Sequence, residues 1–524
     1  MVLTLDSLLQ GMDLTLGEIQ NTKADSKDEE RLRRRHLDAK YGKTLDPINE
    51  ISGLIELSKD RLRIGVEYVI ALADIMQNYE GNRRKIINVN LTEEQKQLLR
   101  AIPDSFNYDN QLQIDLIESK TNHDLAATMD WLKIKLLIEP AYGLQNDAEA
   151  VHFLLTSENV NGPCFALENK KIMEDYVIPK VTGFQRMLLD FGERYIEMPM
   201  IALTHGQPAE YTTLGKKYLN IAHALDESLK KFIIYDEKGE MHPFRFTASM
   251  RGAVGNLNDN VAAYPDIDWR KSLDALIESF GIESLDMSDQ SDTFLRYQAF
   301  ANILSEIELT IEKQGRDFWD AVSGQLYNKI TKKAEKGSSV MPQKKNPWLV
   351  EGGIAIFGKG IAQLRYSFET MRRYHHEGDM SRSILSRDIG DDYGKFFLGI
   401  SRIMSEMKKY VPNENEIKRQ IKQHPEVSTA PIMSALKQMG IEGDAYREMQ
   451  ELSGFNCISD LNWEIYRTKL SLLCDKHHIM EENKDYIMNL LDPITVSEAI
   501  KMGRDCIARC NRTLDTLNEL YGGK

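Results

Sequence analysis

The sequence predicts an all-α protein built around a bundle of long helices. Apolar residues recur at helical spacing over 172–195 and again over 296–330. If the second stretch is one helix, it runs about 50 Å at 1.5 Å per residue. Alternation typical of strands is scarce. Helices that are apolar on more than one side pack into bundles or against partner subunits, so we expect these two at the centre of the molecule.

The chain is too long for one hydrophobic core, and its pattern divides the 524 residues into four segments. A polar insert interrupts the helical pattern near 78–112, and loops are expected at Pro412 and Gly440. The segments are an N-terminal extension, an N-terminal helical domain, a central long-helix bundle domain and a C-terminal helical domain, at 1–35, 36–145, 146–399 and 400–524.

The charge and cysteine content exclude several classes of protein. A net charge of -14 and a pI near 5.4 leave no overall basic field to attract nucleic acid, although a few cations in one cleft can still bind a small anion. Five cysteines form no disulfide framework, which indicates a reducing compartment. The N-terminus lacks a signal-peptide pattern, and no run of about 18 apolar residues would span a membrane. We therefore expect a cytoplasmic protein without membrane or nucleic-acid partners.

Neither a metal nor a cofactor is expected. Cys506 and Cys510 lie four residues apart with His477 and His478 upstream, but the paired-cysteine spacing of a zinc site is absent. No phosphate-binding glycine fingerprint follows a strand-like segment, so a nucleotide-cofactor domain is not predicted.

The most informative segment is the loop 337–347, GSSVMPQKKNP, which we call the signature loop. It offers backbone N–H groups, hydroxyls, ammonium groups and a carboxamide, all of which suit a carboxylate ligand. On this chemistry alone, a solvated basic turn between two helices remains an alternative interpretation.

Three further segments carry reactive side chains. The segment 203–209, LTHGQPA, holds a lone histidine before a glycine, which is more often structural than catalytic. The segment 151–159, VHFLLTSEN, contains a Thr-Ser pair that by itself is typical of a helix cap. The segment 121–124, TNHD, is equally consistent with a capping turn.

Together these segments resemble the adenylosuccinate lyases of the fumarase/aspartase superfamily. The signature loop resembles that of the superfamily, and the three shorter segments resemble the family's THGQPA, Thr-Ser and His-Asp motifs. Two more blocks are similar to the family, GAVGN at 252–256 and DAKYG at 38–42. The resemblance covers about residues 36–400.

The resemblance implies a general base and a general acid. Ser338 would remove a proton from the succinyl carbon, and His205 would protonate the leaving nitrogen. Lys344 and Asn346 would hold the carboxylates, because the dianion that forms needs preorganised donors. A serine is a poor base unless cations and N–H groups stabilise its alkoxide. Glu351 would orient His205, although it also fits an ordinary carboxylate in a first helical turn.

The same resemblance implies a set of substrate-binding residues. Where the family has two arginines around the phosphate, this chain has Gly378 and Arg387, and Arg382 replaces an aspartate. We expect Arg382 to supply the missing contact, with Arg372 or Arg373 as alternatives. The expected set is Lys344, Asn346, Thr156, Ser157, His123, Asp124, Gln290, Lys40, Tyr41, Ser383, Arg387 and Arg382.

Two smaller departures concern single positions. Lys40 replaces a phosphate-contacting arginine and would bind phosphate as a point charge, without the two-pronged contact of a guanidinium. Asn159 replaces the aspartate that usually follows the Thr-Ser pair, which removes a charge but keeps an acceptor.

The resemblance implies elimination of fumarate from adenylosuccinate to give AMP, and from the succinyl-carboxamide ribotide (SAICAR) to give AICAR, without a cofactor. It also implies three helical domains and a homotetramer whose active sites are shared between subunits. One alternative is argininosuccinate lyase, against which the chain reads Thr-His-Gly-Gln rather than Thr-His-Leu-Gln. Another alternative, of a different class, is a catalytically silent helical scaffold. Retention of Ser338, Lys344, Asn346 and His205 together argues against the scaffold.

Overall fold

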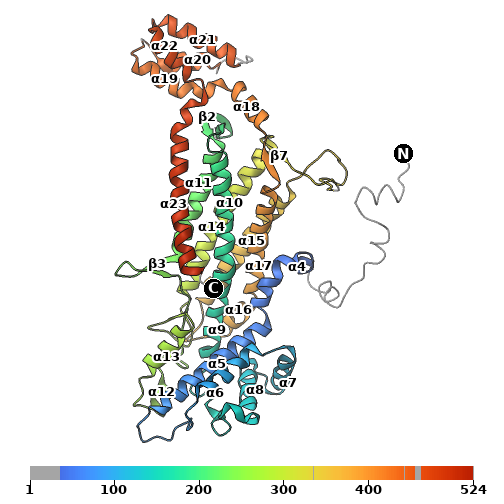
Figure 1. The fold of residues 1–524 in the computed structure, drawn as a ribbon, viewed down its shortest axis with the longest axis vertical. Coiled ribbons are helices and arrows are strands. Elements are labelled where there is room, and N and C mark those ends of the chain that lie inside the picture. The colour runs from blue at the N-terminus through green and yellow to red at the C-terminus, as the bar shows by residue number, and fades with distance from the viewer. Residues whose placement is uncertain (1–35, 334, 442, 455–461, 523–524) are drawn as a thin grey trace, which may run out of the picture.

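The computed structural model describes residues 36–333, 335–441, 443–454 and 462–522, and long helices form most of it (Figure 1). From residue 36 on, the N-terminal part contains the helices α4 (His36–Ile51), α5 (Leu54–Gln77), α6 (Glu93–Asp104), α7 (Tyr108–Thr121) and α8 (Asp124–Ile138). The long central helices are α9 (Ser157–Ile172), α10 (Ile178–Arg194), α11 (Leu214–Leu229), α14 (Leu295–Ser323), α15 (Trp348–Met371), α17 (Ile389–Met407) and α23 (Ser497–Tyr521). Shorter helices are α12 (Asn258–Ala263), α13 (Trp269–Ser279), α16 (Ser381–Ser386), α18 (Glu414–Gln423), α19 (Thr429–Gln438), α20 (Ala445–Leu452), α21 (Trp463–Lys476) and α22 (Glu481–Asn489).

The strands of the described residues form four two-stranded sheets and no larger one. They pair as β1 (Pro199–Thr204) with β2 (Gln207–Thr213), β3 (Ile233–Tyr235) with β4 (Met241–Pro243), β5 (Thr247–Ala248) with β6 (Glu283–Ser284), and β7 (Tyr327–Lys329) with β8 (Tyr410–Pro412). The prediction of an all-α fold is confirmed, because these short ladders only connect helices.

The helix expected over 172–195 is longer than the sequence predicted. A single π-helical turn (Met173–Val177) joins α9 to α10 without leaving helical backbone geometry. The combined rod from Ser157 to Arg194 therefore spans about 55 Å. It sets the long axis of the molecule (Figure 1).

The helix expected over 296–330 is shorter, and that prediction was wrong at its C-terminal end. Helix α14 stops at Ser323, where Gly324 caps it and Gln325 takes a left-handed backbone with φ of 59°. The next residues pair with β8 instead of continuing the helix. Its length is thus about 44 Å at 1.5 Å per residue.

The polar insert expected near 78–112 contains a helix of its own. Thr92 and Gln95 form a capping box that begins α6, because each side chain accepts the other's backbone N–H. Leu99 and Ile102 are buried on the inner side of this short helix. The loops expected at Pro412 and Gly440 are present, as β8 ends at the proline and Gly440 has a φ of 76°.

Two hydrophobic cores hold the molecule together. The larger core runs through the N-terminal part and the long helices, and the smaller one joins α19, α20, α21 and α22 at one end (Figure 1). In the larger core, Phe165 of α9 stacks on Tyr297 of α14 with ring centroids 5.1 Å apart. No helix of the described residues combines the length and the apolar character that a membrane span requires. The division into domains remains a prediction, and its boundary at residue 400 falls inside α17.

Candidate functional site

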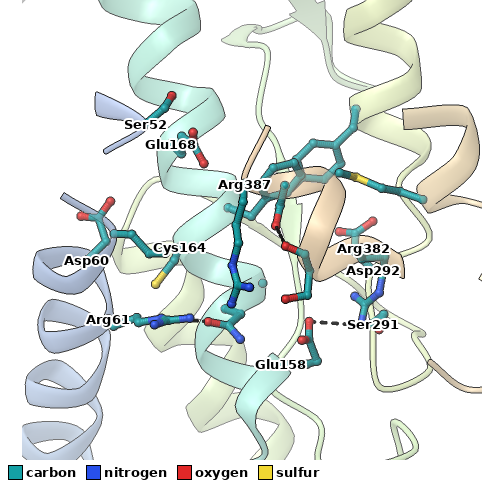
Figure 2. A pocket seen from close by; sticks show the side chains of 18 of the residues that line it. Ser52, Asp60, Arg61, Glu158, Cys164, Glu168, Ser291, Asp292, Arg382 and Arg387 are labelled. Atoms are coloured by element: carbon teal, nitrogen blue, oxygen red, sulfur yellow. Dashed lines mark hydrogen bonds and ion pairs between the residues drawn. The ribbon is translucent and has the colours of Figure 1, made fainter. Parts of the chain in front are cut away.

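A cavity of about 290 Å³ lies between α5, α9, α16 and the segment that leads into α14 (Figure 2). Four residues of the expected binding set line it, namely Gln290, Arg382, Ser383 and Arg387. They come from two segments almost 100 residues apart in sequence. This part of the expected site is therefore formed within one chain.

An ion-pair network closes one side of the cavity. The Asp124 carboxylate accepts from the guanidinium groups of Arg61 and Arg387, each with an N···O distance of 2.7 Å. Burial alone would raise the pKa of Asp124, but Arg61, the Leu125 N–H and Arg387 outweigh it and hold the pKa below its usual value. The carboxylate thus stays ionised and fixes both arginines.

Sequence reasoning missed Arg61. It lies on α5 among apolar residues, and only 4% of its surface is exposed. Its Nε also donates to Asn161 on α9, 3.1 Å away. The available signal was a charged residue on the buried side of an apolar helix, which is rare unless the charge is paired.

His123 and the Thr-Ser pair lie beside this network and also cap helices. The His123 Nε2 is 3.4 Å from the Ser157 hydroxyl, while its Nδ1 accepts the Ala126 N–H at the start of α8. The Thr156 N–H donates to the Asn159 side chain at 2.9 Å, which begins α9. The capping interpretation is confirmed, and the binding interpretation stays a prediction for the same residues. Asn159 replaces the family's aspartate without loss of this cap, because the cap needs only an acceptor.

Arg382 lies on the wall of the cavity, with 6% of its surface exposed. It pairs with Glu158 at 3.1 Å, and its guanidinium stands 5.7 Å from the ring centre of Phe294 and 6.0 Å from that of Tyr374. Glu158 is the second residue that sequence reasoning missed. These contacts keep a buried arginine at the position where the family has an aspartate.

Gly378 fits closely against Gln290. A Cβ atom at this position would lie 3.0 Å from the Gln290 Oε1 and 3.3 Å from the Ser291 hydroxyl. The Gln290 N–H also donates to the Glu377 carbonyl. A side chain at 378 would therefore require the Gln290 amide to shift by a few tenths of an ångström.

The signature loop lies in a different part of the molecule, between β7 and α15. The Ser338 hydroxyl accepts the N–H groups of Met341 at 3.1 Å and Val340 at 3.4 Å. Lys344 is exposed. The Asn346 carbonyl accepts from the buried Lys329, which ties down the end of the loop.

His205 and Glu351 also lie at this end of the molecule. His205 and Gly206 are the two central residues of the tight turn between β1 and β2, with φ of 55° and 74°. The turn exposes the imidazole to solvent. Glu351 is exposed in the first turn of α15. No hydrogen bond or ion pair joins Glu351 to His205 within the described part of this chain.

Lys40 and Tyr41 lie near the start of α15, away from Arg387. The Tyr41 hydroxyl accepts from Arg402 at 2.9 Å, and the rings of Tyr41 and Trp348 flank that guanidinium. Lys40 is exposed. The structure therefore does not bring these two residues to Ser383 and Arg387 within one chain.

Long helices separate the two groups of expected site residues (Figure 1). The rod of α9 and α10 begins at Ser157 and ends just before the hairpin that carries His205, about 55 Å away. Helix α15 begins at the signature loop and ends about 36 Å further on, before Arg382. One chain alone cannot place Ser338 or His205 at the cavity.

The cavity is suited to a polar ligand rather than a metal ion. Within the described residues, the groups close enough to hold a metal are His223, Asp226 and Glu227, and Asp236, Glu240 and His242, none of which lines the cavity. Its lining includes arginines, serine hydroxyls and amides, which bind phosphates and carboxylates, and also the carboxyl groups of Asp60, Glu158, Glu168 and Asp292. Burial raises the pKa of Glu168 on its wall to about 7 and that of Asp292 to about 6.

Comparisons with known proteins agree in sequence and in structure. The chain is 27% identical over 455 residues to adenylosuccinate lyase of Buchnera aphidicola (subsp. Acyrthosiphon pisum), covering 87% of this chain and 94% of the relative. It is 26% identical over 441 residues to adenylosuccinate lyase of Dictyostelium discoideum, covering 83% and 91%. The crystal structure of 3-carboxy-cis,cis-muconate lactonizing enzyme from Pseudomonas putida matches with a TM-score of 0.69 at 15% identity, covering 92% of this chain and all of that one.

The family model that describes lyases matches residues 66–359, more than half of the chain. This range includes the Thr-Ser pair, His205 and the whole signature loop. The protein therefore belongs to the lyase family of the fumarase/aspartase superfamily.

Proposed function

We propose that the protein eliminates fumarate from adenylosuccinate to give AMP, and from SAICAR to give AICAR. The observation that carries the proposal is that Gln290 and Arg387 line one cavity, while Asp124, which pairs with Arg387, and Ser157 lie beside it. The resemblance assigned each of these to substrate binding, from a different part of the sequence. The similarity to enzymes named adenylosuccinate lyase supports the choice of substrate.

In this proposal, Ser338 is the base. Two backbone N–H groups donate to its hydroxyl, and the same groups would stabilise the alkoxide that has to form before it removes a carbon-bound proton. Lys344 and Asn346 hold the succinyl carboxylates as negative charge develops. His205, exposed at a tight turn, donates the proton to the leaving nitrogen, and Glu351 orients it.

The nucleotide phosphate binds to Arg387 and Ser383, with Arg382 in the role of the family's missing arginine. Both arginines are already paired with carboxylates, to Asp124 and Glu158, so the cavity is preorganised before substrate enters. Charge-assisted bonds of this kind contribute about 1.5–3 kcal/mol each.

We infer that the active protein is a homotetramer with shared active sites. The support is the distance of tens of ångströms between the cavity and the signature loop within one chain. A second chain has to bring its loop to the cavity for base and phosphate site to act on one substrate. We also infer a cytoplasmic location, since the four described cysteines are free and buried, as is usual in a reducing compartment.

The test measures fumarate release by the pure protein from adenylosuccinate, SAICAR and argininosuccinate in separate assays, with Ser338→Ala as the control for a contaminating lyase. We expect release from the first two and none from the third. Release from argininosuccinate alone would replace this proposal with the rival lyase. Absence of release from all three would favour the catalytically silent scaffold.

A further inference from the structure

One wall of the cavity carries polar atoms that neither the proposed chemistry nor the fold uses. This wall is the segment between β6 and α14, which contains Ser291 and Asp292, together with Arg382 of α16 (Figure 2). Ser291 is 3% exposed and Asp292 and Arg382 are each 6% exposed. All three side chains line the cavity.

Three atoms on this wall lack a hydrogen-bond partner within the described residues: the Ser291 hydroxyl, the Asp292 Oδ2 and the Arg382 Nε. The other Asp292 oxygen accepts the Phe294 N–H, which fixes the carboxyl group in place. The Thr247 hydroxyl lies near the carboxyl, but the two do not meet with hydrogen-bond geometry. Buried polar groups almost always have partners, so three open positions in one wall indicate a polar ligand.

The carboxyl group of Asp292 disfavours an anion at its own end of the wall, whereas the guanidinium of Arg382 can still reach the phosphate. An ionised Asp292 repels a phosphate or a carboxylate, and a protonated one offers only a single donor. The wall offers a carboxylate acceptor, a hydroxyl that can donate or accept, and a guanidinium N–H donor. This set matches two neighbouring alcohol groups of a ligand, because an alcohol both donates and accepts. A carboxylate that accepts from ribose hydroxyls is a recurring arrangement in nucleotide-binding proteins.

We propose that Asp292 and Ser291 bind the ribose hydroxyls of the substrate and so select ribonucleotides over deoxyribonucleotides. The inference rests on the proposed function, in which Arg387 and Ser383 hold the phosphate at the same cavity. In a nucleotide, the phosphate is attached to the ribose that carries the two hydroxyl groups. In the cavity, the residues proposed to bind the phosphate lie next to those proposed to bind the hydroxyls.

The experiment compares kcat/KM for adenylosuccinate with that for its 2′-deoxy and 3′-deoxy forms. For the wild-type protein we expect a preference of about tenfold to hundredfold for the ribonucleotide over at least one deoxy form, as for a lost hydrogen bond to a charged group. Asp292→Asn should reduce this preference to about threefold or less, mainly by loss of activity on the ribonucleotide. Ser291→Ala should reduce it by a smaller factor.

Asp292→Asn keeps an oxygen that accepts the Phe294 N–H, and Ser291→Ala adds no volume. We therefore expect both variants to fold like the wild-type protein. The preference is a ratio measured in one preparation, so it does not depend on how much of a variant folds. Asp286→Asn, an exposed carboxylate earlier in the same segment, is the control and should leave the ratio unchanged.

The outcomes separate the two proposals. A wild-type protein that releases no fumarate from adenylosuccinate overturns the proposed function, and the inference with it. A wild-type protein that is active but shows the same ratio as Asp292→Asn and Ser291→Ala overturns the inference alone. In that case water, not ribose, satisfies the three atoms.

Discussion

The cavity and the signature loop differ in how far one chain completes them. Around the cavity, Arg61, Arg382 and Arg387 are each held by a carboxylate or an amide, and most of the lining residues are buried or half-buried. In the signature loop, Lys344 is exposed and its neighbours make few contacts beyond the loop itself. The difference indicates a division of tasks. In the proposed function, one chain preorganises the residues that bind the substrate, while the residues that react with it need a second chain to complete their surroundings.

This division follows from the lengths of the helices. Rods of about 36 Å and 55 Å lie between the two regions, and packed helices do not bend enough to bring their ends together. If the proposed roles hold, the binding residues at one end and the reacting residues at the other can act on one substrate only when chains associate so that unlike ends meet. The first three predictions below test the two regions separately, from the largest expected effect to the smallest.

The largest effect is expected in the signature loop, from Ser338→Ala. Removal of a general base should lower kcat about a thousandfold or more and leave KM nearly unchanged, because the hydroxyl acts mainly in the transition state. Steady-state fumarate release measures both constants. Ser339→Ala is the matched control and should stay within about tenfold of wild type. If Ser339→Ala is the inactive variant and Ser338→Ala the tolerant one, the base has been assigned to the wrong serine.

A smaller effect is expected in the cavity, from Arg382→Ala. Loss of a charge-assisted contact to the phosphate should raise KM for adenylosuccinate about tenfold to hundredfold with little change in kcat. The measurement is again steady-state kinetics, now over a wide substrate range. Arg372→Ala and Arg373→Ala provide controls on exposed arginines nearby. An unchanged KM for Arg382→Ala with a raised KM for either control would transfer the phosphate contact to that residue.

The smallest effect concerns stability, at Asp292. Burial raises the pKa of this carboxyl to about 6, above its unfolded value of 3.8, so the native state binds the proton more tightly. The resulting cost grows as pH rises from about 4 to 6 and is constant above, at no more than about 3 kcal/mol. Asp292→Asn removes this cost. Thermal melting should therefore show a higher Tm for the variant at pH 8, with a difference that shrinks at pH 5. An equal difference at both pH values would mean that ionisation of Asp292 does not matter.

Part of the cavity and its surroundings could be predicted from the sequence, because some of their residues match the family. Ser157, Asp124, Gln290 and Arg387 were each assigned by resemblance, and the structure brings them together from distant segments. Arg61 and Glu158 were not assigned. An arginine on an apolar helix and an acid after a helix cap show their roles only once their partners, Asp124 and Arg382, are placed in space.

The reverse holds for the signature loop. Its residues were the easiest to identify, since eleven consecutive positions carry the resemblance, but the fold does not connect them to the cavity. The end of α14 was missed for a local reason, because Gly324 and Gln325 stop a helix whose apolar spacing continues to Leu326. Apolar periodicity predicts which residues share one side of a helix, but it does not predict where the backbone turns.

The most direct test of the shared site mixes two impaired proteins. Ser338→Ala has an intact cavity and Arg387→Ala an intact signature loop. Each is purified, and the two are combined under conditions that exchange subunits, with exchange verified by a tag on one of them. Assayed at low substrate, the mixture should recover about a quarter of wild-type activity, as random assortment gives for a site built from two chains. A mixture that exchanges subunits fully but stays no more active than its components would contradict the shared site.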